Sequence, residues 1–162
     1  MELRYVARAD AREGTPPRLT GEEGRISLNL ATPRELGGSG GDGVSAEGLL
    51  AAGYAACLLS ALRYEATRQR IDLNGAEVSC LADVSGQDDT FQVRFSLEVS
   101  LPSISGDQAQ ALLNSALGAW PFGSAHDQQH PAVRLRSEGG RGVNNALQEV
   151  RQEATAGRGY GG

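Results

Sequence analysis

The sequence predicts an α+β fold in which long helices pack on antiparallel β-sheets. Two kinds of pattern support this prediction: segments in which apolar and polar residues alternate, as in half-buried strands, and segments with apolar residues at helical spacing. Along the chain they read strand, strand, long helix, strand, strand, helix and short strand, which is typical of helices packed on an antiparallel sheet. A chain of 162 residues suits one core. We therefore expect one domain over residues 1–137 and a tail over residues 138–162.

Two alternating segments near the N-terminus predict the first strands. Residues 3–9 and 26–30 place an apolar residue at every second position, which gives each segment one buried face. Between them, residues 12–24 contain several glycines and the pair Pro16-Pro17. Such residues favour turns, so we expect a connecting loop there.

The central helix is expected over residues 46–70. It follows the glycine-rich stretch 36–44, which cannot hold a helix, and Ser45 is a suitable N-cap with Glu47 in the first turn. The helix is apolar nearly all round as far as Leu62, so most of its sides must be buried. One domain of this size has few layers to surround such a helix. We therefore expect a homodimer in which a second copy covers part of it.

Two further strands, a helix and a last short strand are predicted after the central helix. Residues 76–84 and 91–99 alternate and are separated by a short polar loop, which favours an antiparallel pair. A helix is expected over residues 105–119, because apolar residues recur at helical spacing until a proline stops them. A short strand over 133–136 follows. Beyond it the chain is rich in glycine and arginine, and we expect a mobile tail.

Composition excludes several classes of function. The formal net charge of -5 argues against a nucleic-acid partner, because duplexes are held mainly by clustered cations. All basic residues are arginine, which excludes Schiff-base chemistry and a phosphate-loop lysine. Residues 1–10 lack the apolar core of a signal peptide, and the longest apolar stretch, 49–59, is well short of the roughly 18 residues that span a bilayer. We expect a cytoplasmic protein with no membrane association.

Only two cysteines occur, Cys57 and Cys80, too few for a disulfide framework and without metal-type spacing. From its small neighbours alone, Cys57 is either a core residue acting as a small hydrophobe or a reactive thiol. Cys80 falls on the apolar face of a predicted strand and is expected to be packed. His126 and His130 have a spacing seen at metal sites but lie in a predicted loop. We therefore expect neither a metal nor a cofactor.

Several motifs carry a resemblance to a known family. They read Ala-Thr-Pro-Arg-Glu-Leu-Gly-Gly at 31–38, Gly-Gly-Asp-Gly at 40–43 and Ala-Ala-Gly-Tyr-Ala-Ala-Cys at 51–57, with Glu47 between the last two, and further matches at 101–102, 107–112 and 121–122. With these motifs, roughly residues 5–136 closely resemble the organic hydroperoxide resistance (Ohr) branch of the OsmC family. The motif that contains Cys57 is highly specific.

The resemblance implies an interwoven homodimer with two active sites at the subunit interface. It also implies reduction of organic and fatty-acid hydroperoxides by a cysteine thiolate, which a second cysteine then captures as a disulfide that lipoylated proteins reduce. By position, Cys57 matches the cysteine that attacks peroxide, and Glu47 matches the supporting carboxylate. Tyr54 and Phe122 are expected to line an apolar pocket.

The sequence departs from the family at two site positions. Thr15 stands where the family has an arginine in a Gly-Gly-Arg motif, and Trp120 stands where the resolving cysteine of a Cys-Pro-Tyr motif falls. A nearby guanidinium lowers the pKa of a thiol, so without it we expect Cys57 to be a sluggish nucleophile unless Arg12 or Arg18 substitutes. Without a resolving thiol, oxidised Cys57 must wait for an external thiol.

Glu47 cannot reach Cys57 along one straight helix. Ten residues at a rise of about 1.5 Å separate them by roughly 15 Å. Contact requires a break near Gly48 or Gly53, or a glutamate from a second chain. The alternative role for Glu47 is a first-turn carboxylate that satisfies the helix dipole.

The sequence therefore predicts a weak, one-cysteine organic hydroperoxide reductase of the oxidative stress response. Its partners would be a second copy of the chain, an organic hydroperoxide and an external thiol reductant, with lipoylated proteins as the family's example. The alternative is a non-catalytic dimer of the same fold that binds an apolar or thiol-reactive small molecule. Cys57 and Glu47 favour the first prediction, whereas Thr15 and Trp120 favour the second.

Overall fold

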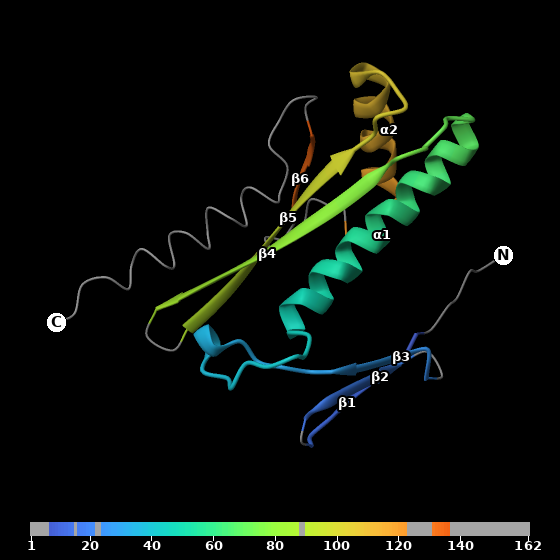
Figure 1. Cartoon of the computed structure of the whole chain (residues 1–162). Helices are drawn as coiled ribbons and strands as arrows, with labels where there is room; N and C mark the ends of the chain where they lie inside the picture. Colours follow the sequence, from blue (N-terminus) through green and yellow to red (C-terminus); the bar gives the residue numbers. More distant parts are fainter. Residues whose placement is uncertain (1–6, 15, 22–23, 88–89, 123–130, 137–162) are drawn as a thin grey trace. The chain divides into compact units, whose positions relative to one another are not determined.

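The structure is a computed structural model in which residues 7–14, 16–21, 24–87, 90–122 and 131–136 are described. The chain forms two compact units, Met1–Leu50 and Ala51–Gly162 (Figure 1). The predicted tail over residues 138–162 lies outside the described residues. The division into a domain over 1–137 and a tail therefore stays a prediction.

The first unit contains a three-stranded antiparallel sheet. Its strands, in the order β1-β2-β3, are β1 (Ala9–Arg12), β2 (Arg18–Gly21) and β3 (Ile26–Asn29). The prediction of a connecting loop over residues 12–24 is wrong, because β2 lies inside it. This strand has four residues, and only Leu19, which pairs with Leu28, is large and apolar. One apolar residue cannot produce an alternating pattern, so the sequence gives no sign of the strand.

A glycine-rich connection leads from this sheet to the central helix, as predicted. It begins with a single turn of 3-10 helix, η2 (Arg34–Leu36). Gly41 has φ of 117°, a left-handed conformation that residues with a Cβ rarely adopt. The connection ends at Ser45, whose Oγ accepts a hydrogen bond of 3.1 Å from the backbone N–H of Gly48. The predicted N-cap of the central helix is therefore confirmed.

The remaining elements agree closely with the predicted order. They are α1 (Ala46–Gln69), β4 (Glu77–Gln87), β5 (Thr90–Ser100), α2 (Gly106–Ala119) and β6 (Ala132–Leu135). The strands form a second sheet in the order β4-β5-β6. β4 and β5 are antiparallel as predicted, whereas β6 runs parallel to β5. The chain crosses over through α2 between them, and a helical crossover brings the next strand back in the same direction. The α+β class is confirmed, with this one parallel pairing.

Both helices pack on one face of the second sheet. The core consists of buried side chains from α1, α2, β5 and the residues that follow them: Leu58, Leu62, Ala66, Leu97, Val99, Leu101, Ala109, Leu112, Leu113, Ala116 and Trp120. Alternation along each strand directs these residues to one side of the sheet. The other side is polar. There, Arg134 on β6 forms an ion pair of 2.9 Å with the buried Glu98 on β5.

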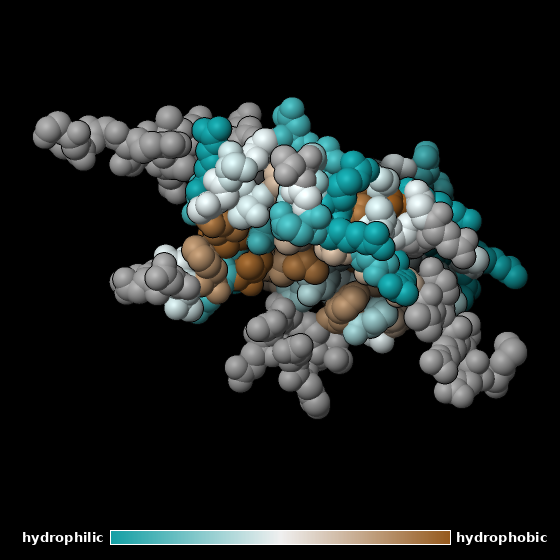
Figure 2. Space-filling model, turned by 90° about the horizontal axis from the view of Figure 1, so that it is seen from below, coloured by the Kyte–Doolittle hydropathy of each residue, from teal (hydrophilic) through white to brown (hydrophobic). Residues whose placement is uncertain are grey.

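Parts of the apolar surface remain uncovered in the single chain. Phe91, Phe122 and Leu50 are about half exposed, and brown apolar surface appears between polar residues in Figure 2. On α1, Ala52 and Ala56 are also exposed, one turn apart. The sequence predicts this helix to be apolar nearly all round, and one chain does not bury all of it. In the part of the chain that the structure describes, neither helix is long and apolar enough to cross a membrane.

The C-terminus of α1 is closed by two backbone hydrogen bonds around a left-handed residue. Arg70 has φ of 55°. The N–H of Ile71 donates to the carbonyl of Ala66 at 2.9 Å, and the N–H of Arg70 donates to the carbonyl of Thr67 at 3.4 Å. This is the Schellman arrangement, in which glycine is usually found at the left-handed position. A side chain there carries a conformational cost.

Replacement of Arg70 by glycine is expected to stabilise the fold by about 0.5–1 kcal/mol, because glycine adopts positive φ without the clash that a Cβ causes. The measurement is the free energy of unfolding in urea, followed by circular dichroism. Arg63→Gly is the matched control, since Arg63 is exposed within α1, where glycine costs about 0.5–1 kcal/mol. A loss of stability in both variants would contradict the strain at Arg70.

Candidate functional site

Cys57 lies on the side of α1 that packs against the core. Its neighbour Leu58 is fully buried, and Tyr54, one turn earlier, also packs against the core cluster. Cys57 itself is partly buried and is a free thiol. Among the described residues of the second unit, none forms a hydrogen bond with this thiol. Cys57 is therefore a partly accessible sulfur in apolar surroundings.

Four aromatic rings gather next to this part of α1, and we call them the aromatic cluster: Tyr54, Phe95, Trp120 and Phe122. The ring centroid of Tyr54 lies 4.8 Å from that of Phe95, 6.1 Å from that of Trp120 and 5.2 Å from that of Phe122. Trp120 and Phe122 are 5.8 Å apart. Edge-on and tilted ring pairs at these distances contribute about 0.5–1.5 kcal/mol each beyond their buried area. The cluster holds Tyr54 at its centre, one helical turn from Cys57.

Trp120 is fixed in the cluster by the end of α2. The helix ends at Ala119, and Trp120 has an extended backbone with φ of -75° and ψ of 126°. An extended residue is favoured there because Pro121 follows, and the ring of a proline excludes the helical conformation for the residue before it. Only 3% of Trp120 is exposed, and its Nε1 is buried without a hydrogen-bond partner among the described residues. The indole ring of Trp120 is thus buried at the position where, by the resemblance, the family has its resolving cysteine.

Cys80 is a second free thiol, with a different environment. It lies on β4 opposite Leu97 and packs against the core cluster, as predicted for the apolar face of that strand. Burial raises the pKa of the Cys80 thiol to about 11. Desolvation disfavours the charged thiolate, so Cys80 stays protonated well above neutral pH.

The structure does not bring Glu47 to Cys57 within one helix. α1 is continuous from Ala46 to Gln69, without a break at Gly48 or Gly53. Glu47 is in the first turn of α1, where a carboxylate interacts favourably with the helix dipole. Its predicted role beside Cys57, through a glutamate from a second chain, stays a prediction.

Arg18, one of the two arginines that flank Thr15 in the sequence, is hydrogen-bonded on its own sheet. Thr15 itself lies outside the described residues, as do His126 and His130. Arg18 on β2 donates hydrogen bonds to Asn29 Oδ1 at 2.8 Å and to Ser27 Oγ at 2.6 Å on β3. These contacts hold the Arg18 guanidinium on its own sheet. The idea that Arg12 or Arg18 replaces the family's arginine stays a prediction.

Sequence reasoning missed Phe95 as a site residue, although it identified the other three aromatic residues of the cluster. The signal was present, because Phe95 alternates with polar residues on β5 and so falls on the face that meets α1. Strand alternation gives the face of a residue but not its partner on a distant helix. Within the described ranges, no three His, Cys, Asp or Glu side chains come together as a metal site.

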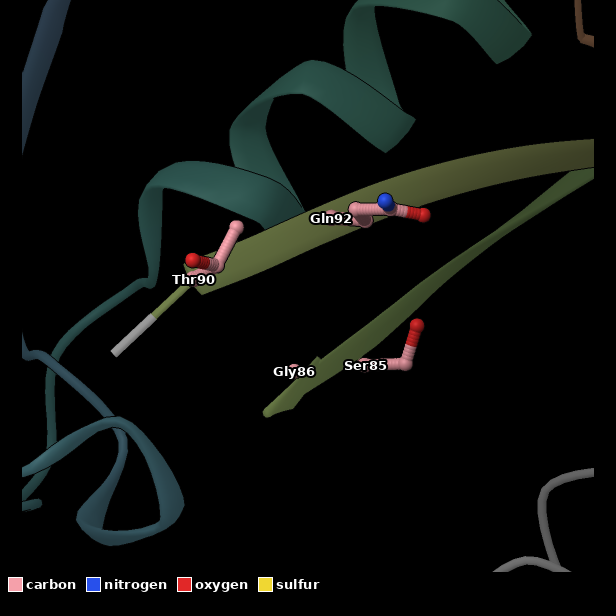
Figure 3. Close-up of a pocket in the computed structure, with 4 residues that line it drawn as sticks. All are labelled: Ser85, Gly86, Thr90 and Gln92. Atoms are coloured by element: carbon pink, nitrogen blue, oxygen red, sulfur yellow. The ribbon is translucent and has the colours of Figure 1, made fainter. Parts of the chain in front are cut away.

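One pocket lies at the end of the β4–β5 hairpin. Its volume is about 360 Å³, and it is lined by Ser85 and Gly86 on β4 and by Thr90 and Gln92 on β5 (Figure 3). The lining is neutral, and none of its side chains is a carboxylate, an imidazole or a thiol. The pocket therefore lacks the thiol that the predicted chemistry needs.

Fold and site together define an α+β protein with two free thiols. One of them, Cys57, lies on a long helix one turn from the Tyr54 ring of the aromatic cluster. Residues 38–136 match the family model described as "OsmC-like protein", and the chain belongs to this family. It is 37% identical over 123 residues to an organic hydroperoxide resistance protein of Xanthomonas axonopodis pv. citri, covering 75% of this chain and 86% of the relative.

Solved structures give the same result. The fold is similar to that of an organic hydroperoxide resistance protein from Legionella pneumophila, with a TM-score of 0.70, 31% identity, and coverage of 83% of this chain and 97% of that one. It is also similar to the organic hydroperoxide resistance protein OhrB of Bacillus subtilis, with a TM-score of 0.68, 26% identity, and coverage of 82% and 98%. The predicted family is therefore confirmed.

Cys80 is expected to react with iodoacetamide at pH 8 roughly two hundredfold more slowly in the folded protein than in the unfolded chain. About a quarter of an ordinary thiol with a pKa near 8.5 is ionised at this pH, against about one in a thousand at a pKa of 11. The rate in the folded state should rise with pH up to that pKa. The Cys57→Ser variant isolates Cys80 for measurement by mass spectrometry. Equal rates in folded and guanidinium-unfolded protein would contradict the protection.

Proposed function

We propose that this chain is a thiol-dependent organic hydroperoxide reductase of the one-cysteine type, with slow turnover, that acts in the oxidative stress response. One observation supports this function above others: the partly accessible Cys57 thiol lies beside an aromatic cluster, in a chain similar to proteins named for organic hydroperoxide resistance. Apolar surroundings favour a peroxide that carries an alkyl or aryl group, because burial of that group is favourable.

The reaction is a two-electron oxidation of the Cys57 sulfur. The thiolate attacks the terminal oxygen of the hydroperoxide, so that a sulfur–oxygen bond forms while the oxygen–oxygen bond breaks. The leaving alkoxide takes a proton and departs as an alcohol, and Cys57 is left as a sulfenic acid. Thr15 stands where the family has its arginine, and a positive charge beside the sulfur would stabilise the attacking thiolate. We therefore expect a slow first step unless Arg12 or Arg18 supplies that charge.

An external dithiol is the expected reductant. It converts the sulfenic acid back to the thiol, and the products are water and the oxidised dithiol. Trp120 has no sulfur, and the raised pKa of Cys80 makes it a poor nucleophile. We propose that a lipoylated protein supplies the dithiol, by the resemblance to the family. We place this reaction in the cytoplasm, as the sequence predicts, where thiols are kept reduced.

Brief exposure to cumene hydroperoxide is expected to add one oxygen atom to Cys57, detected by mass spectrometry of the intact protein and its peptides. Reaction with hydrogen peroxide should be about tenfold slower, equivalent to losing the burial of roughly two methylene groups. Cys57→Ser should abolish the oxidation, whereas Cys80→Ser should keep it. A Cys57 thiol that is inert to both oxidants would exclude the reductase.

The same assay tests Glu47. We propose that Glu47 of one chain orients the site of the other, so Glu47→Gln should slow the oxidation of Cys57. Glu35→Gln is the matched control, since Glu35 is an exposed carboxylate on η2. An equal rate in both variants would leave Glu47 with its helix-dipole role alone.

We propose that the active form is a homodimer with its sites at the subunit interface. The exposed apolar residues of α1, Ala52 and Ala56, support this arrangement, as does the exposed Phe91 on β5. A second copy would bury them and remove apolar surface from water. It would also supply the Glu47 that an unbroken α1 keeps away from its own Cys57.

Ala56→Glu is expected to shift the protein from dimer to monomer, because a buried unpaired carboxylate is costly. Light scattering after size-exclusion chromatography measures the mass. Ala111→Glu is the control, because Ala111 is an exposed alanine on α2. A dimer that survives Ala56→Glu unchanged would place the interface elsewhere.

The second candidate function is non-catalytic binding of an apolar or thiol-reactive small molecule by the same dimer. The buried Trp120 favours it, because an aromatic ring occupies the position where the family has its second thiol. The cumene hydroperoxide experiment separates the two candidates, since a binding protein leaves Cys57 unoxidised.

A further inference from the structure

The aromatic cluster contains a buried hydrogen-bond donor for which no described residue provides an acceptor. The indole N–H of Trp120 can only donate, and it has no acceptor among the described residues. Most buried polar groups in folded proteins have a partner, because an unsatisfied one costs free energy. Within the part of the chain that the structure describes, this N–H makes no hydrogen bond, so it is able to donate to the oxygen of a bound molecule.

The surroundings of this donor define the chemistry of the missing acceptor. Phe95 and Phe122 are hydrocarbon, and the only other polar group on the rings of the cluster is the hydroxyl of Tyr54. A charged acceptor would be desolvated there without a counter-charge. A neutral oxygen on an apolar molecule fits, because it accepts the hydrogen bond while its hydrocarbon part contacts the rings.

Phe122 is the part of the cluster that can open. It is 47% exposed, whereas Trp120, at a centroid distance of 5.8 Å, is 3% exposed. Exposed side chains change rotamer within nanoseconds, so Phe122 can swing outward without unfolding the core. A ligand that enters there meets the indole and the Tyr54 side of α1, one helical turn from Cys57.

We propose that the aromatic cluster is a ligand site in which the indole N–H of Trp120 donates a hydrogen bond to the oxygen of an arylalkyl hydroperoxide or of its alcohol product. Trp120 is thus a specificity-determining residue. It selects apolar molecules that carry an acceptor oxygen. This inference rests on the proposed function for the identity of the substrate, but binding of the alcohol does not require the redox step.

A matched pair of probes tests the hydrogen bond in the whole protein. 2-Phenyl-2-propanol and tert-butylbenzene have the same shape, and a methyl group replaces the hydroxyl in the second. The chain contains one tryptophan, so its ¹H–¹⁵N spectrum has one indole signal. The alcohol is expected to move this signal downfield. The ratio of its affinity to that of the hydrocarbon should be about tenfold higher in the wild type than in a variant without the donor, as for one hydrogen bond. The hydrocarbon should leave the indole proton near its free position.

Trp120→Phe keeps an aromatic ring and removes the donor. Ligand-observed NMR should then show that the affinity for the alcohol, relative to the hydrocarbon, falls about tenfold. If this variant fails to fold, the response of the indole signal to the two probes in the wild-type protein still decides the question. The proposal is overturned if neither probe binds, if the affinity ratio is the same in the wild type and the variant, or if the indole signal ignores the alcohol. The last result is expected where a water molecule or a second chain already holds the N–H.

The outcome is separable from that of the proposed function. Oxidation of Cys57 by cumene hydroperoxide with an indole that ignores the alcohol would overturn this inference and leave the reductase intact. An indole that binds the alcohol beside an inert Cys57 would exclude the reductase and establish the cluster as the site of a binding protein.

Discussion

The packing of one side of α1 against the second sheet is the constraint on which the site depends. Leu58 and Leu62 are fully buried against β5 and α2, together with Ala66. Because side chains on a helix repeat every 3.6 residues, fixing these three also fixes the direction of Tyr54 and Cys57. The core therefore determines which side chains reach the aromatic cluster.

The same core gives the two cysteines different chemistry. Cys80 faces it from the middle of a strand, and desolvation keeps its sulfur protonated to about pH 11. Cys57 faces it from a helix, at the edge of a cluster whose outer residue, Phe122, is half exposed. Both thiols are partly buried, and the raised pKa distinguishes Cys80.

Much of the fold could be predicted from the sequence, because local periodicity marks α2, β4 and β5, and a long apolar run after a glycine-rich stretch marks α1. β2 could not, since one large apolar residue between polar neighbours has no period. The parallel direction of β6 depends on the crossover through α2, which no local pattern records. At the site, the motif identified Cys57, Tyr54 and Trp120. The unpartnered indole N–H could not be predicted, because satisfaction of a buried group depends on contacts between distant segments.

The crossover between β5 and β6 also sets an order for assembly. β4 and β5 are joined by a hairpin, so their eleven-residue pairing closes almost no loop. β6 instead meets β5 across about 36 positions, as in the ion pair between Glu98 and Arg134. Closing that loop costs conformational entropy, which the pairing of a four-residue strand must offset. The cost is smaller if α2 has already folded and brought the ends of the loop closer together. We therefore expect the pairing of β6 with β5 at the edge of the sheet to depend on the packing of α2.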